Sequence, residues 1–176
     1  MWGQSPWGGY GANPLPGRLQ RLWNETAHKL AGGFPYSEGI YEDLNKVICS
    51  QLYWNGQNST AEIVREYITF EFSPVVVEEV AKAFAIFEEN HQREQIATSA
   101  IEAFRLIDAA SVKLTPQVLK SWRWRIVYLR ALIDRELLRT HGELKGEVLK
   151  KAFNELTNIY HAENGHSMPI HPPVIK

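Results

Sequence analysis

The sequence predicts an all-α protein: a helical bundle of six to seven helices behind an irregular N-terminal leader rich in Trp, Gly and Pro. Three observations predict this class. Apolar residues recur at spacings of three and four through residues 37–163, which is the period of an amphipathic helix. Helix-start signals precede several of these stretches, and the connections span mostly about 2–8 residues, as in bundles. Residues 33–37 are the one good place for a strand, and a lone strand is not stable by itself.

Glycines and prolines bound the first elements. Residues 1–14 carry no helical periodicity and are predicted to be a loop, with a composition more typical of the interior of a longer protein than of a natural start. A helix opens at residues 14–17 and ends at Gly32-Gly33. The next helix takes Ser37 as its N-cap and ends at Asn55-Gly56.

Cap signals mark the following helices. Ser59 and Glu62 form a capping-box sequence in front of an apolar run. Ser73-Pro74 combines a serine cap with proline at the first helical position. A break near residues 90–92 then precedes a further helix. No sequence repeat of about 30–45 residues is present, which argues against a consensus solenoid.

The same cap-plus-proline signal at Thr115-Pro116 begins what we expect to be the longest helix, running to about His141. Its predicted core stripe comprises Val118, Trp122, Ile126, Leu129, Ile133 and Leu137. Trp124 is expected on another face. A last helix follows Gly146 and reaches about Tyr160.

These elements divide the chain into three parts. Residues 1–36 hold the leader, the first helix and an extended segment, residues 37–163 form the helical domain, and residues 164–176 are a tail rich in Pro and His. The chain has 176 residues, 44% of them hydrophobic, which suffices for one domain with a real core.

Charge and cysteine content exclude several classes of function. The net charge of −1 argues against a nucleic-acid partner or an anionic membrane surface, because both need a clustered excess of Lys and Arg. No stretch approaches the roughly 20 apolar residues of a membrane span, and the first residues do not form a signal peptide. The single cysteine, Cys49, excludes an intrachain disulfide and is expected to be a buried structural thiol.

The most informative segment joins the leader to the helices. It carries aromatic, amide and acidic side chains within a few residues of one another: Tyr36, Glu38, Tyr41, Glu42, Asp43, Asn45 and Lys46. Aromatic faces beside carboxylates and amides are typical of carbohydrate pockets, since sugars offer C–H faces and hydroxyl rims. We therefore predict that Glu38 accepts hydrogen bonds from sugar hydroxyls, that Tyr36 and Tyr41 stack, and that Asn45 and Lys46 orient the acids.

A less specific interpretation explains the same acidic residues. Glu38 and Glu42 lie four positions apart and share a helix face with Asp43 beside them. Acidic residues in a first turn interact favourably with the helix dipole, by roughly 0.3–1 kcal/mol each. On spacing alone this structural role is the commoner one.

Two other groups of residues are candidate sites. Arg125, Arg130, Arg135 and Arg139 would form a basic strip for base stacking and phosphate contacts, or would pair with Asp134, Glu136 and other acids, and the net charge favours pairing. His161, His166 and His171 are five residues apart, which fits no helical face, so no metal site is expected there.

Two motifs resemble a known group of proteins. Tyr36-Ser37-Glu38-Gly39-Ile40 and Glu42-Asp43-Leu44-Asn45-Lys46 are similar to a recurrent region of large bacterial glycoside-hydrolase-like proteins of the α-glucuronidase and hexosaminidase type. The segments Glu66–Phe72, Phe87–His91 and Trp124–Glu136 fit the helical region of those proteins. The resemblance extends over roughly residues 7–162.

The resemblance implies a position within a larger architecture. Residues 34–36 would be the last strand of a (β/α)8 barrel, residues 39–53 its last helix and residues 15–31 the helix before it. Functional loops of such barrels follow the strands, where Ser37 and Glu38 would lie. Most of the barrel is absent, so catalytic carboxylates are expected elsewhere.

We therefore expect a C-terminal helical portion of a carbohydrate-active protein that contributes a glycan-binding surface, with no cofactor and no complete active site. A longer protein containing it would be a glycoside hydrolase. Its partners would be a carbohydrate and either a missing barrel domain or a second copy. The alternative is a non-catalytic assembly module that self-associates through Leu19, Trp23, Leu44 and Ile48. The sequence indicates neither the sugar nor the compartment.

Overall fold

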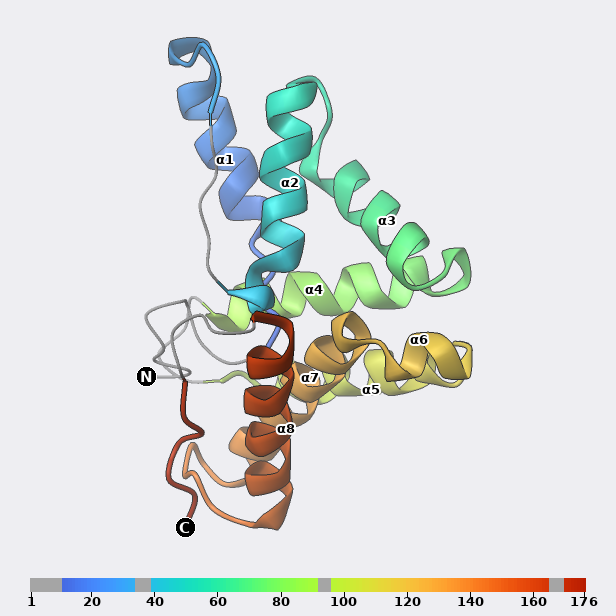
Figure 1. The fold of residues 1–176 in the computed structure, drawn as a ribbon, viewed down its shortest axis with the longest axis vertical. Helices are drawn as coiled ribbons and strands as arrows, with labels where there is room; N and C mark the ends of the chain where they lie inside the picture. The colour runs from blue at the N-terminus through green and yellow to red at the C-terminus, as the bar shows by residue number, and fades with distance from the viewer. Residues whose placement is uncertain (1–10, 34–38, 92–95, 165–169) are drawn as a thin grey trace.

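The structure, a computed structural model, describes residues 11–33, 39–91, 96–164 and 170–176 (Figure 1). These residues form eight α-helices and three short 3-10 helices, and no strand occurs among them. The α-helices are α1 (Pro16–Thr26), α2 (Asp43–Trp54), α3 (Thr60–Glu71), α4 (Val77–His91), α5 (Ser99–Ser111), α6 (Pro116–Lys120), α7 (Trp122–Arg139) and α8 (Glu147–Asn164). The 3-10 helices are η1 (Ala27–Lys29), η2 (Ile40–Glu42) and η3 (Pro74–Val76). The prediction of an all-α helical bundle is confirmed.

Local sequence signals explain where several helices begin. The capping box at α3 is complete, because Ser59 Oγ accepts from Glu62 N at 3.2 Å and Glu62 Oε2 accepts from Ser59 N at 3.0 Å. Ser73 caps the turn that leads into α4, and Thr115 Oγ1 accepts from Val118 N at 3.4 Å to cap α6. Each bond satisfies a backbone N–H that the first helical turn leaves without a partner.

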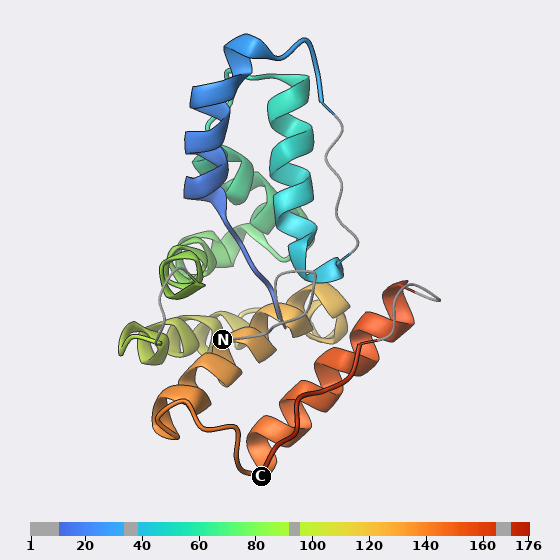
Figure 2. The same ribbon diagram turned by 90° about the vertical axis from the view of Figure 1, so that its left-hand side faces the viewer.

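The helices form two groups around a continuous apolar core. Helices α1, α2 and α3 contact one another at one end of the molecule (Figures 1 and 2). Helices α4, α5 and α7 pack across the middle, and α8 packs on α7 at the other end. The largest side chains that are fully enclosed include Trp124, Phe84, Phe87, Phe153 and Tyr160.

The end of the leader is part of this core. Residues 11–14 are buried and cross between the two groups of helices. Ala12 N donates to Ile126 O at 3.3 Å, and Asn13 N donates to Tyr41 O at 3.0 Å. Arg130 Nη1 donates to Asn13 Oδ1 at 2.6 Å. The predicted loop conformation is correct for these residues, but they are a structural strap across the bundle.

The long helix predicted from Thr115-Pro116 is two helices. Ser121 has an extended backbone (φ −65°, ψ 141°) between α6 and α7, and its Oγ accepts from Trp124 N at 3.2 Å. A serine in this conformation is a favoured N-cap, so it starts a new helix.

This break changes the predicted place of one of two tryptophans. Trp124 is completely buried, and Trp122 is partly buried and packs against the core. The prediction that Trp124 lies on a face other than the core stripe is therefore wrong, whereas Trp122 contacts the core as predicted. The prediction assumed one continuous helix through Ser121. Because α7 starts anew after Ser121, its residues face other directions than a continuous helix would give them.

The second predicted helix also begins later than expected. Its proposed cap, Ser37, lies outside the described residues. The chain forms the 3-10 turn η2 over Ile40–Glu42, and α2 starts at Asp43.

Candidate functional site

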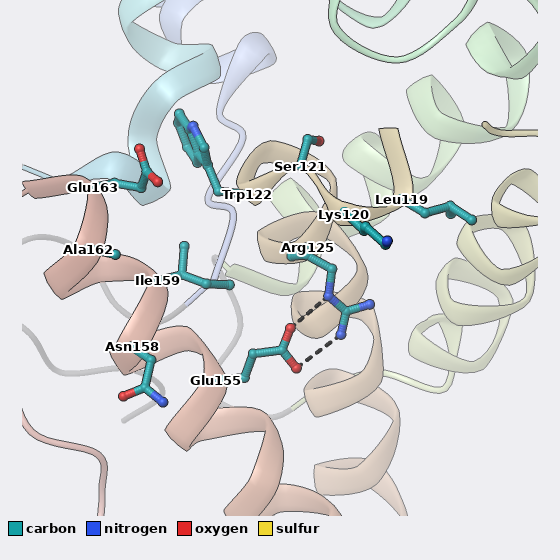
Figure 3. Close-up of a pocket in the computed structure, with 10 residues that line it drawn as sticks. All are labelled: Leu119, Lys120, Ser121, Trp122, Arg125, Glu155, Asn158, Ile159, Ala162 and Glu163. Carbon is teal, nitrogen blue, oxygen red and sulfur yellow. Dashed lines mark hydrogen bonds and ion pairs between the residues drawn. The ribbon is translucent and has the colours of Figure 1, made fainter. Parts of the chain in front are cut away.

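An open cleft of about 820 Å³ lies between the α6–α7 junction and the C-terminal half of α8 (Figure 3). Ten residues line it: Leu119, Lys120, Ser121, Trp122, Arg125, Glu155, Asn158, Ile159, Ala162 and Glu163. The extended backbone at Ser121 creates one wall, because it turns the chain between two helices. The volume is within the range of about 300–1,000 Å³ typical of pockets for organic ligands.

An ion pair occupies the centre of the cleft. Arg125 Nε donates to Glu155 Oε1 at 2.7 Å and Arg125 Nη2 donates to Glu155 Oε2 at 3.0 Å. Figure 3 shows the guanidinium and the carboxylate facing each other from α7 and α8. The guanidinium also lies 5.1 Å from the ring centroid of Tyr128. Two parallel hydrogen bonds fix both side chains in one orientation.

Arg123 and its acidic partners hold Trp122, the aromatic wall of the cleft, in place. The guanidinium of Arg123 lies 4.4 Å from the ring centroid of Trp122. Arg123 Nε donates to Asp43 Oδ2 at 2.8 Å, Arg123 Nη2 donates to Asp43 Oδ1 at 3.3 Å, and Glu71 lies 3.5 Å from Nε. Tyr67 Oη donates to Asp43 Oδ2 at 2.9 Å. Asp43, in the segment predicted to carry the site, thus supports the cleft through Arg123.

The residues predicted to bind a glycan are Tyr36, Glu38, Tyr41, Glu42, Asn45 and Lys46. Of these six, Tyr36 and Glu38 lie outside the described residues. Tyr41 is 2% exposed, and its hydroxyl donates to Leu156 O at 2.8 Å. Its ring packs against Tyr160 on α8. In this structure Tyr41 offers no face for stacking, because η2 lies directly against α8.

Of the other three predicted residues, Glu42 ends η2, and Asn45 and Lys46 lie in the first turn of α2. Asn45 Oδ1 accepts from Leu15 N at 2.9 Å, and Asn45 Nδ2 donates to Asn13 O at 2.7 Å. Lys46 Nζ donates to Gly39 O at 2.9 Å, and Glu42 is half-buried. Asn45 and Lys46 therefore hold main-chain segments in place, and the glycan-binding role of the six residues stays a prediction.

The sequence interpretation missed the cleft. Its walls come from residues about 35 positions apart on separate helices, and only packing of α8 on α7 brings them together. One signal was available: Ser121 before Trp122 is an N-cap residue that predicts a helix start there. The predicted segment is nevertheless linked to the cleft, since Arg123, next to Trp122, pairs with Asp43 at 2.8 Å, and η2 contacts α8.

The arginine strip behaves as the pairing interpretation predicted. Arg125 pairs with Glu155 at 2.7 Å and Arg130 pairs with Asp134 at 2.9 Å. Arg135 and Arg139 pair with Glu136 at 2.8 and 2.9 Å. These pairs neutralise the guanidinium charges that a phosphate-binding strip would need.

The remaining candidates have structural contacts. His161 Nε2 accepts from Ile170 N at 3.1 Å, and His166 lies outside the described residues. The part of the chain that the structure describes contains no group of three or more His, Cys, Asp or Glu able to hold a metal ion. Cys49 is half-buried, and burial followed by the charge of Glu42 raises the pKa of its thiol.

None of the described helices is long and apolar enough to cross a membrane. Comparisons with protein-family models, with curated proteins and with solved structures found no match to this chain. The resemblance to glycoside-hydrolase-like proteins therefore stays a prediction from the sequence motifs.

Proposed function

We propose that this chain is the helical portion of a carbohydrate-active protein and binds a saccharide in the cleft between α6, α7 and α8. It contributes a binding surface and not a complete active site. The observation that carries this proposal is the indole of Trp122, which lines the cleft and is braced by Arg123.

The lining supports a saccharide because it combines two kinds of surface. Trp122 and the neighbouring Ile159 offer apolar contact to the C–H face of a sugar ring. Asn158, Glu163 and Ser121 offer hydrogen-bond donors and acceptors to its hydroxyls. A few polar groups among apolar ones are typical of small-molecule sites.

The decisive experiment is a calorimetric titration of the chain with a panel of oligosaccharides, comparing Trp122→Ala with Trp54→Ala. Trp54 is 91% exposed at the end of α2 and does not line the cleft, so it is a matched control. Loss of an aromatic contact should weaken binding about three- to tenfold in Trp122→Ala. Equal effects of the two substitutions, or no saccharide binding by the parent chain, would contradict the proposal.

The rival function is a helical assembly module. Trp54 on α2 and Phe70 on α3 favour it, because they are 91% and 88% exposed. The surface predicted from the sequence does not, since Leu44 and Ile48 are buried in the chain's own core. Leu19 and Trp23 also pack against that core.

Sedimentation velocity over a wide concentration range tests whether the chain is an assembly module. An assembly module should form larger species as concentration rises, and Trp54→Ser should weaken them. A chain that stays monomeric throughout removes this alternative.

A further inference from the structure

We infer that the saccharide bound in the cleft is an uncharged one that presents vicinal hydroxyls to the Arg125–Glu155 pair. This inference rests on the proposed function and specifies its ligand. It follows from the charges that line the cleft and from the way two of them are already used.

The charged side chains of the lining balance. Lys120 and Arg125 are basic, and Glu155 and Glu163 are acidic, so the formal charges cancel. The charges that line a binding site are usually complementary to those of its ligand, and like charges placed together cost free energy. A balanced lining therefore favours an uncharged ligand.

The arrangement of the pair strengthens this argument. An acidic sugar would need a guanidinium that is free to hold its carboxylate with two parallel hydrogen bonds. Among the residues that line the cleft, Arg125 is the one guanidinium, and its Nε and Nη2 already hold Glu155 at 2.7 and 3.0 Å. A bound uronate would also meet the carboxylate of Glu155.

The same pair suits two neighbouring hydroxyls. A guanidinium has five N–H donors, and two of those of Arg125 are used by Glu155, which leaves three. The carboxylate of Glu155 keeps lone pairs beyond those that accept from Arg125. Donors and acceptors therefore lie side by side, and a vicinal diol offers both from adjacent carbons. Figure 3 shows this pair to one side of Ile159, with Trp122 and Asn158 on the other side of the cleft.

The test uses two ligands that share a skeleton and differ in charge: a digalacturonate and its methyl ester. Binding to the full chain is measured at about 50 mM and about 500 mM salt. We expect the uncharged ester to bind at least tenfold more tightly than the acid, with little effect of salt. Tighter binding of the acid, weakened by salt, would overturn the inference but leave the proposed function standing. If neither these ligands nor any oligosaccharide of the panel binds, the proposed function itself fails.

A variant tests the role of the pair. Glu155→Gln releases Arg125 and removes the carboxylate, so it should reduce the preference for the ester and increase the affinity for the acid. Glu147→Gln is the matched control, because Glu147 starts α8 and does not line the cleft. A simple loss of packing would weaken both ligands alike. An unchanged preference in Glu155→Gln would therefore overturn the inference.

Discussion

Arg123 Nε lies 2.8 Å from Asp43 Oδ2, and this contact joins the start of α7 to the start of α2. The same guanidinium covers one face of Trp122 at 4.4 Å. Asp43 is thus connected to the cleft through a single side chain. An acidic residue of the segment that the sequence singled out supports the proposed site from outside it.

The first prediction concerns Arg123 as a positioning residue. Arg123→Lys should weaken saccharide binding about three- to tenfold, because an ammonium group cannot stack on the indole and hold Asp43 bidentately at once. The unfolding free energy should fall by about 1 kcal/mol or less, since the pair is partly exposed.

Calorimetry measures the affinity and urea denaturation measures the unfolding free energy. The near-ultraviolet circular dichroism of Trp122, assigned with Trp122→Phe, reports whether the indole keeps its position. Arg65→Lys is the control, because Arg65 pairs with Glu78 on the exposed surface of α3 and α4. Unchanged affinity and an unchanged Trp122 signal in Arg123→Lys would exclude the positioning role.

The second prediction concerns the buried pair of α7. Arg130 and Asp134 are 4% and 0% exposed, and Arg130 Nε lies 2.9 Å from Asp134 Oδ1. Asp134→Ala should cost about 3–5 kcal/mol of unfolding free energy, because it leaves a buried charge without its partner. The double variant Arg130→Met, Asp134→Leu should cost less than Asp134→Ala, since no charge then stays buried.

Urea denaturation measures these costs. Glu143→Ala breaks the exposed pair with Lys145 and should cost far less than Asp134→Ala. A double variant that is less stable than Asp134→Ala would show that Arg130 contributes mainly through its bonds to the strap, Ala12 O and Asn13 Oδ1.

The third prediction is a dependence of stability on alkaline pH. Burial, followed by the charge of Asp43, holds the pKa of the Tyr67 phenol well above 10 in the folded protein. In the unfolded chain the phenol loses its proton near pH 10. The unfolded state then binds fewer protons than the folded state, so the contribution of Tyr67 is present below about pH 10 and is lost as the pH rises further.

The unfolding free energy of Tyr67→Phe should therefore fall less steeply with rising pH than that of the parent chain above about pH 10. At about pH 7 it should be less stable by about 1 kcal/mol, because the bond to Asp43 is lost. Urea denaturation across this pH range gives both values. Tyr53→Phe, at a 38% exposed position, should keep the parent slope, and a parent slope in Tyr67→Phe would refute the prediction.

The fourth prediction concerns two glycines with the same positive φ angle. Gly11 and Gly142 both have φ +82°, so alanine at either position is strained by about 1–2 kcal/mol. A Cβ at Gly11 would lie 3.1 Å from Arg130 Cβ, whereas a Cβ at Gly142 would meet nothing within 4 Å. Gly11→Ala should therefore be the more destabilising change in thermal unfolding. Equal losses would mean that the strap moves away from α7 at little cost.

Most of the secondary structure was predictable, because its signals are local. The capping box at Ser59 and Glu62 and the caps at Ser73 and Thr115 are confirmed, since each bond joins residues close in sequence. The prediction failed at Ser121, where one serine in an extended conformation ended the helical phase.

The candidate site was predictable only in part, because exposure depends on distant partners. Tyr41 was expected to face a ligand, and it is buried because Leu156 and Tyr160, far along the chain, lie against it. Conversely, Trp122 was assigned to the core alone, and it both packs against the core and lines the cleft. Aromatic side chains suit both environments, so their local sequence does not distinguish them.

The sequence by itself determined the helical class, the caps at Ser59, Ser73 and Thr115, and the pairing of Arg130, Arg135 and Arg139 within α7, because periodicity, caps and charge spacing act over a few residues. Tertiary structure decided what no local signal specifies: the burial of residues 11–14 beneath Arg130, the bracing of Trp122 from Asp43, and the meeting of Arg125 with Glu155. Each of the last three joins residues at least 30 positions apart, and packing of whole helices brings them together.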